Sequence, residues 1–137
     1  FGTYQKPYQL KYLYSILKSL NYSFSSSTTP VSSMWNGPII KTPSGILELP
    51  VSGWHDFPAR ILDSWGFRFS PTRRFTENDY VEQFQKMITF FESSSVTGIF
   101  NIYADPSQVY DCEPFFECMG LTRNLKNPSF ADLLTSI

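Results

Sequence analysis

The chain has few of the residues that form metal sites and bind nucleic acid. Of its 137 residues one is histidine and two are cysteine, and charged residues make up 17%, against about 25% in ordinary soluble domains. A structural zinc site usually takes four ligands from Cys and His, so no metal site is expected within this chain. The formal net charge of −1 leaves no basic excess to neutralise phosphates, and we therefore expect no nucleic-acid partner.

Long apolar runs and a recognisable leader are also lacking. No apolar run approaches the ~20 residues that span a bilayer, so no transmembrane segment is expected. Residues 1–7 do not have the form of a signal peptide. Because the first residue is Phe rather than Met, we expect the chain to begin inside a longer polypeptide.

The two cysteines, Cys112 and Cys118, do not form a CxxC pair. If both lie on one helix, a local disulfide between them is geometrically awkward. We expect two reduced, half-buried thiols, with a local disulfide as the alternative. This pattern leaves the compartment undetermined.

Aromatic residues are abundant. They make up 18% of the chain, with 13 Phe, 8 Tyr and 3 Trp, and hydrophobic residues reach 42%. So much ring surface suits a packed core, a sugar-binding groove, or a surface that meets another part of the same protein. The core is the favoured interpretation, because burial is the commonest use of an aromatic ring.

In the first half of the chain, the apolar pattern predicts one helix followed by two strands. A helix is expected over 7–20, with a stripe at helical spacing and Asn21 as a left-handed stop. The stripe consists of Leu10, Leu13, Leu17 and Leu20, with Ile16 beside it. A short strand is expected over 22–24, a loop over 25–43, and a strand over 46–51 with Glu48 awkwardly placed in its middle.

The second half predicts a long helix over 77–93, capped by Thr76. Its inner face would be Tyr80, Phe84, Met87, Ile88 and Phe91. A buried strand over 96–103, a turn at 105–107 and a short helix ending near Gly120 follow. A last helix is expected after Ser129. Strands that alternate with helices favour a parallel α/β fold, and three or four strands suggest an incomplete one.

Several residues are candidates for a functional site. His55 beside Asp56 has the composition of a general base, and the alternative is a loop histidine bonded to backbone. The acidic candidates are Glu48, Asp56, Asp63 and Asp105.

Asp105 follows a predicted strand, where α/β folds place functional groups, although Asp-Pro is also an ordinary turn starter. Trp54 and Phe57 have flat rings that suit stacking on a sugar, and the alternative is core packing.

Four segments in this order resemble the second half of a polysaccharide deacetylase (NodB homology) domain. They are residues 1–4, the helix over 8–20, the Ser-rich strand end over 21–27, and the Gly-Ile-Leu-Glu-Leu-Pro-Val run over 45–51. Residues 99–107 stand where the family has a strand ending in His-Pro. The most specific matches are the Ser-rich strand end and the run over 45–51.

The resemblance implies that 1–137 form a single partial domain, the C-terminal part of a distorted (β/α) barrel. It implies hydrolysis of N-acetyl groups on a carbohydrate polymer or oligosaccharide with a divalent, zinc-like metal. The metal ligands of the family lie in the N-terminal half of the domain, which this chain lacks and which would be its partner. The candidate catalytic residues are Asp105 and Asp56, and the candidate substrate-binding residues are Trp54, His55, Phe57 and Tyr4. The Trp54-x-Asp56 pair is similar to the groove loop of the family, whereas His55 has no counterpart there.

Three departures from the family pattern leave a second function open. Gly2 occupies the place of the active-site Arg, Tyr4 falls about where a Pro is expected, and Asp105 replaces the catalytic His. A carboxylate at that place needs a strongly raised pKa to act as a general acid. A non-catalytic carbohydrate-binding relative is therefore the second hypothesis, and an unrelated α/β interaction module is the third.

Overall fold

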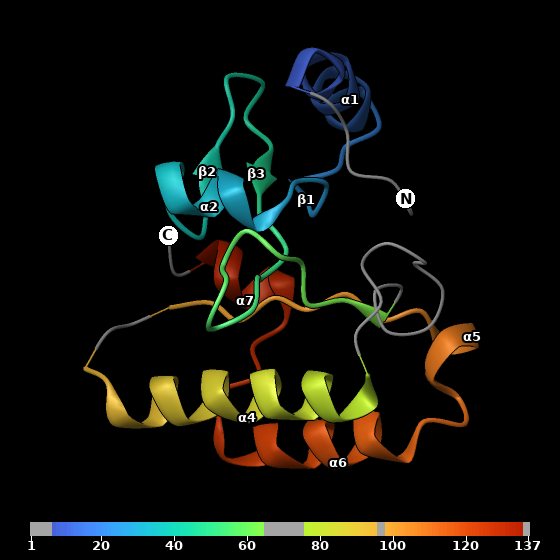
Figure 1. Cartoon of the computed structure of the whole chain (residues 1–137). Coiled ribbons are helices and arrows are strands. Elements are labelled where there is room, and N and C mark those ends of the chain that lie inside the picture. The colour runs from blue at the N-terminus through green and yellow to red at the C-terminus, as the bar shows by residue number, and fades with distance from the viewer. Residues whose placement is uncertain (1–6, 65–75, 96–97, 136–137) are drawn as a thin grey trace. The chain divides into compact units, whose positions relative to one another are not determined.

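The computed structural model describes residues 7–64, 76–95 and 98–135 (Figure 1). The chain forms two compact units. The first contains the described residues up to Leu62 together with 98–103, and the second contains the other described residues. The described part is a mixed α/β structure, mostly helical, with one small three-stranded sheet.

Helix α1 spans Pro7–Ser19 in the first unit, as the sequence predicts to within a residue. It ends at Asn21, which adopts a left-handed conformation with φ of 62°. The Asn21 N–H donates to the Lys18 carbonyl at 3.0 Å, and the Tyr22 N–H donates to the Leu17 carbonyl at 2.9 Å. These two bonds form a Schellman motif, in which a left-handed residue satisfies the last carbonyls of the helix. The predicted stop is therefore confirmed.

The apolar stripe predicted for α1 lies on a face that is only partly buried. Tyr14 is buried on it, and three leucines of the predicted stripe are half-buried: Leu10, Leu13 and Leu17. Ile16 and Leu20 are 57% and 62% exposed. Leu20 of the predicted stripe and Ile16 beside it therefore lie on the exposed side of the helix.

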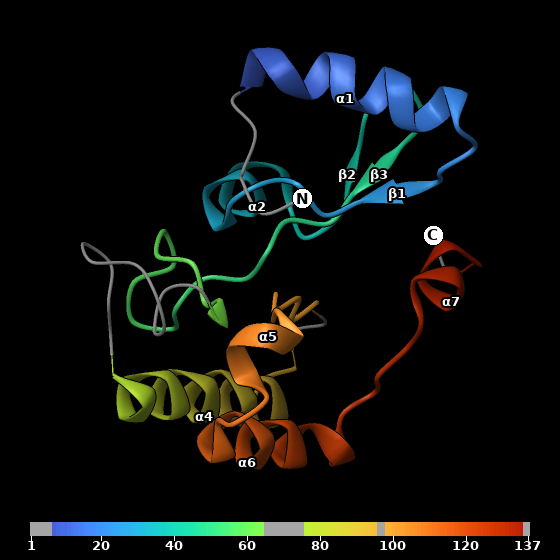
Figure 2. The same cartoon turned by 90° about the vertical axis from the view of Figure 1, so that its right-hand side faces the viewer.

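The sheet contains three short strands in the order β1-β3-β2. Strand β1 (Phe24–Ser25) pairs in parallel with β3 (Leu47–Glu48), and β2 (Ile40–Lys41) pairs with β3 in antiparallel fashion. Figure 2 shows α1 lying across one side of these strands. The ladder covers only two residues of the strand predicted over 46–51. Within the described ranges this sheet is open, and no barrel is formed.

Helix α2 (Pro30–Asn36) lies in the segment predicted to be loop, so that prediction was wrong there. Thr29 precedes the helix in an extended conformation, and Pro30 occupies its first position. Proline is well suited to that position, because its fixed φ is helical and its missing N–H has no helical partner to lose. The helix ends at Gly37, whose φ is 83°. Within this Ser-, Thr- and Pro-rich segment, the Thr29-Pro30 pair therefore marks the start of a helix.

The strand predicted over 96–103 does not form in its described part, 98–103. The backbone there bonds to a loop. The Ser52 N–H donates to the Asn101 carbonyl at 2.7 Å, and the Asn101 N–H donates to Ser52 Oγ at 2.9 Å. Because these groups are engaged with Ser52, Asn101 is not available for a sheet ladder.

The second unit is built around α4 (Glu77–Ser93) and α6 (Glu113–Leu121), which lie side by side (Figure 1). The predicted inner face of α4 is confirmed for Tyr80, Phe84 and Ile88, which are all at most 5% exposed. Met87 and Phe91 are only half-buried.

The contact with α6 includes the Phe115 ring, whose centroid lies 6.4 Å from that of Tyr80. Cys112 and Cys118 are both thiols, and both are buried more deeply than predicted. Burial raises the pKa of Cys118 to about 12.

Three short helical segments complete the second unit. They are α5 (Pro106–Val109), the 3-10 turn η1 (Thr122–Asn124) and α7 (Phe130–Thr135). Gly120 does not stop α6, which runs one residue further. The Ser129 cap is confirmed, since the Asp132 N–H donates to Ser129 Oγ at 3.2 Å. None of the described helices is both long enough and apolar enough to cross a membrane.

Candidate functional site

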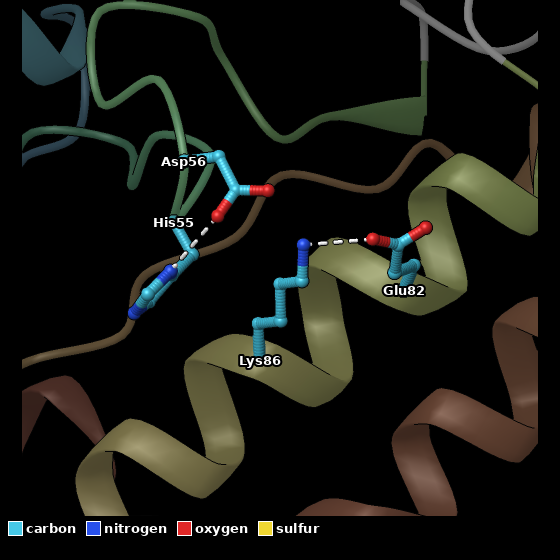
Figure 3. Close-up of polar contacts among 4 residues, drawn as sticks. All are labelled: His55, Asp56, Glu82 and Lys86. Atoms are coloured by element: carbon cyan, nitrogen blue, oxygen red, sulfur yellow. Dashed lines mark hydrogen bonds and ion pairs between the residues drawn. The ribbon is translucent and has the colours of Figure 1, made fainter.

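His55 and Asp56 lie in a loop that is closed at its base. The loop begins at Gly53, which forms a bridge with Ile61. A Cβ on Gly53 would come within 1.9 Å of the Pro58 carbonyl oxygen, so only glycine fits there. His55 Nδ1 lies 3.3 Å from Asp56 Oδ1, with 38% and 51% of the two side chains exposed (Figure 3). The sequence-predicted pair therefore forms, and it is open to solvent.

The two aromatic residues of this loop have different surroundings. Trp54 is buried, and the Arg60 guanidinium lies 3.9 Å from the centroid of its ring. One face of the indole is thus covered by a cation–π contact. Phe57 is 62% exposed. This geometry favours core packing for Trp54, and it leaves Phe57 as the ring of this loop that can stack on a ligand.

Asp105 caps helix α5. Its Oδ1 accepts a hydrogen bond from the Ser107 hydroxyl at 2.6 Å and another from the Ser107 N–H at 2.9 Å. Both bonds lower the pKa of Asp105, and the bond from the Ser107 hydroxyl has the larger effect. A general acid at neutral pH needs a raised pKa. The position is thus better suited to accepting hydrogen bonds than to protonating a leaving amine.

Asp63, in the second unit, is buried. Burial raises the pKa of Tyr80, and electrostatic interactions with Cys118, Cys112 and Asp63 raise it further. Ser64, the neighbour of Asp63, donates to Gln108 Oε1 at 2.6 Å and accepts from the Asp105 N–H at 3.0 Å. Ser64 therefore positions the start of α5. Tyr4 and Gly2 lie outside the described residues.

Glu48 is the most completely buried carboxylate of the first unit, with 0% exposure. Its Oε1 accepts three hydrogen bonds: from the N–H of Ser27 at 2.7 Å, and from the N–H and hydroxyl of Thr28 at 2.9 Å each. Hydrogen bonds of this kind offset the cost of taking a carboxylate out of water. Glu48 on β3 thus holds the turn that follows β1.

The second carboxylate oxygen, Oε2, is buried as well. No donor of the described part of the chain forms a regular hydrogen bond with Glu48 Oε2. The Tyr14 hydroxyl is close enough for Glu48 to affect it. Burial raises the pKa of Tyr14, and the negative charge and acceptor oxygen of Glu48 raise it further. Tyr14 therefore stays protonated and turns a donor toward the buried carboxylate.

Glu48 belongs to a polar group that we call the Glu48 cluster. Its members are Tyr14, Ser25, Ser27, Thr28 and Glu48. The hydroxyls of Ser25 and Ser27 bond to each other. Nearby, the Asn101 amide donates to Ser26 Oγ at 3.0 Å and to the Leu49 carbonyl at 2.9 Å. The Glu48 cluster thus joins the carboxyl ends of the two parallel strands.

Sequence reasoning named Glu48 as an acidic candidate but did not find its partners. The usable signal was a glutamate in an apolar strand, together with a Ser- and Thr-rich strand end. A carboxylate in such a place has to be bonded, and short hydroxyl side chains and backbone N–H groups are the usual donors. Its complete burial keeps Glu48 away from a polymeric ligand, so its role is to fix the backbone.

The residues present do not fit the divalent metal that the family resemblance implies. Within the described ranges no three His, Cys, Asp or Glu side chains come together to hold a metal ion. Among the described residues no third His, Cys, Asp or Glu joins the His55–Asp56 pair in such a group, and Glu48 Oε1 is occupied by protein donors. We therefore derive no chemical step through a metal from this chain.

Comparison with known proteins found no match among family models, curated proteins or solved structures.

Proposed function

We propose that this chain is the C-terminal part of a polysaccharide-deacetylase-like domain, which acts on a carbohydrate polymer or oligosaccharide. In this proposal another segment of the same domain supplies the metal ligands and the remaining strands of a distorted (β/α) barrel. The chain described here contributes the framework and part of the ligand-binding surface.

The pairing of β1 with β3 is the observation that supports this proposal. The two most specific matching segments, the Ser-rich strand end and the run over 45–51, are neighbours in the sheet. They pair in parallel, with Ser25 opposite Glu48. In open α/β sheets, ligands bind beyond the carboxyl ends of parallel strands. The Glu48 cluster holds the backbone at that end.

Within this proposal the exposed loop provides the contacts with sugar. Phe57 offers an apolar ring face, and Asp56 and His55 offer polar groups for hydroxyls. None of these roles needs a proton transfer by this chain.

The geometry of Asp105 favours a second candidate function, a non-catalytic carbohydrate-binding relative. The family places a general acid at this position, whereas Asp105 is a helix cap with a lowered pKa. A protein that had lost the acid but kept the groove would bind the polymer without cleaving the N-acetyl group.

Metal analysis and an acetate assay on the full-length protein test both candidates. Bound zinc with acetate release from a chito-oligosaccharide would support the enzyme. Binding of the chito-oligosaccharide without acetate release would support the binding relative. If the protein neither binds the oligosaccharide nor releases acetate, both candidates are wrong.

The contribution of the loop can be measured by replacing Phe57 with Ala. We expect about tenfold weaker binding of the chito-oligosaccharide, equivalent to about 1.4 kcal/mol. Trp35→Ala is the matched control, because Trp35 is also an exposed ring, 84% accessible, on α2. Equal losses in the two variants would contradict the role given to the loop.

A further inference from the structure

The turn that follows helix α1 contains a sequence pattern that accepts carbohydrate. Asn21, Tyr22 and Ser23 fit the pattern Asn-x-Ser/Thr, in which x is any residue except proline. The pattern occurs once in the sequence. Asn127 also has a serine two positions later, but Pro128 lies between them and excludes it. Because so short a pattern also arises by chance, its place in the fold has to be suitable for a glycan.

The three residues of the pattern lie at the surface. They connect α1 to β1, and all three are exposed, with Tyr22 55% accessible. Asn21 has a left-handed backbone, with φ of 62°, and it ends the helix. An N-linked glycan is bulky and hydrophilic, so only a side chain at the surface can carry one in a folded protein. Asn21 meets this requirement.

The side chains that the modification uses have no other role in the fold. The helix stop uses backbone groups alone, namely the N–H of Asn21 and the N–H of Tyr22. Within the described ranges no hydrogen bond engages the Asn21 side-chain amide or the Ser23 hydroxyl. The Asn127 amide, by contrast, donates to the carbonyls of Thr122 at 2.9 Å and Leu125 at 3.0 Å. A glycan on Asn21 therefore costs the fold no hydrogen bond.

We propose that Asn21 carries an N-linked oligosaccharide. The donor is an oligosaccharide linked through a diphosphate to a lipid, and an oligosaccharyltransferase catalyses the transfer. A bond forms between Asn21 Nδ2 and the anomeric carbon of the first sugar, and the bond from that carbon to the diphosphate oxygen breaks. The diphosphate leaves with the electron pair, and Nδ2 loses one proton to a base of the transferase.

This inference goes beyond the proposed function and does not depend on it. It rests on residues 21–23, whereas the proposed contacts with sugar lie in the loop that contains Phe57. It implies that the full-length protein enters the secretory pathway, where the donor and the transferase are found. A protein without deacetylase activity or carbohydrate binding would still carry the glycan.

Mass spectrometry of the protein from its natural source tests the proposal. Trypsin cuts after Lys18 and Lys41, so Asn21 lies in the peptide 19–41. This peptide should carry a glycan that peptide N-glycosidase removes, leaving Asp at position 21. The tryptic peptide that begins at Asn127 is the internal control and should be unmodified. An unmodified Asn21 would overturn the proposal.

Three variants show whether the pattern itself directs the modification. Asn21→Gly removes the acceptor amide and keeps the turn, because glycine adopts positive φ freely. Ser23→Ala keeps Asn21 and removes the hydroxyl. Both variants should lose the glycan completely when the full chain is secreted from eukaryotic cells behind a leader sequence. Ser23→Thr is the matched control and should keep the glycan, because threonine also fits the pattern.

The variants also provide results that would contradict the proposal. A glycan that persists in Asn21→Gly or Ser23→Ala would show that another residue carries it. Loss of the glycan in Ser23→Thr would show that the pattern does not direct the transfer. Circular dichroism checks that each variant is folded, so that a lost glycan is not the result of a lost structure.

Discussion

At the scale of single residues, the buried carboxylate of Glu48 is the strongest constraint in the first unit. An unpaired charge inside a protein is costly, and this one is balanced by three donors from residues 27 and 28. Removing the carboxylate leaves those donors buried without an acceptor, which costs about 1–3 kcal/mol for each group. The stability of the turn after β1 therefore depends on one side chain from β3.

We predict that Glu48→Leu lowers the free energy of unfolding by about 3–5 kcal/mol. Glu48→Gln, which keeps one acceptor oxygen, should cost less. Urea denaturation measures both changes. The control is Glu82→Gln, whose partner Lys86 lies 2.7 Å away in an exposed i,i+4 pair (Figure 3). That change should cost less than about 0.5 kcal/mol, and a cost at Glu82 equal to that at Glu48 would contradict this account.

Asp105 provides a second prediction at this scale. Ser107 lowers the pKa of Asp105 in the folded protein. The ionised Asp105 therefore stabilises the folded state at pH values above its pKa in the unfolded chain. This stabilisation is lost as the pH falls through the pKa of Asp105 in the folded protein. Ser107→Ala should raise the Asp105 pKa toward the ordinary value of 3.8. Carboxyl-carbon NMR titration measures the shift, with Asp132 as an internal control whose pKa is lowered by Ser129. An Asp105 pKa that is unchanged by the substitution would show that another group lowers it.

At the scale of elements, local chemistry accounts for most helix starts. Helix α4 begins with a capping box, in which the Asp79 N–H donates to Thr76 Oγ1 at 3.1 Å and the Thr76 N–H donates to Asp79 Oδ2 at 2.8 Å. Thr76 was identified from the sequence because cap and first turn are adjacent in the chain. Helix α2 was missed, although Thr29 and Pro30 were equally local signals, because the surrounding Ser and Pro residues suggested a loop.

Replacing Thr76 with Ala should destabilise the second unit by about 1 kcal/mol, because the Asp79 N–H loses its acceptor Thr76 Oγ1 and Asp79 Oδ2 loses the hydroxyl donor. Chemical denaturation followed by circular dichroism measures the change. Thr89→Ala is the control, since Thr89 is exposed within the same helix and alanine has the higher helix propensity. If the two variants are equally stable, the capping box contributes little.

At the scale of the whole molecule, the high aromatic content is divided between core and surface. Tyr80, Phe84 and Phe115 are buried, whereas Tyr8, Tyr12 and others remain exposed. The favoured interpretation of the aromatic composition as core is therefore confirmed only in part. Two of the exposed rings lie on α1, at Tyr8 and Tyr12.

The sequence by itself determined the features that depend on neighbouring residues. These are α1 with its Asn21 stop, the capped helix α4 and the Ser129 cap, each set by side chains within a few positions of the backbone they bond. Only the tertiary structure decided which apolar residues are buried and whether an extended segment joins a sheet, because both depend on partners distant in the chain. Ile16 and Asn101 are the clearest examples. The Glu48 cluster belongs to this second class, since its carboxylate and its donors are about twenty residues apart and meet only when β1 and β3 pair.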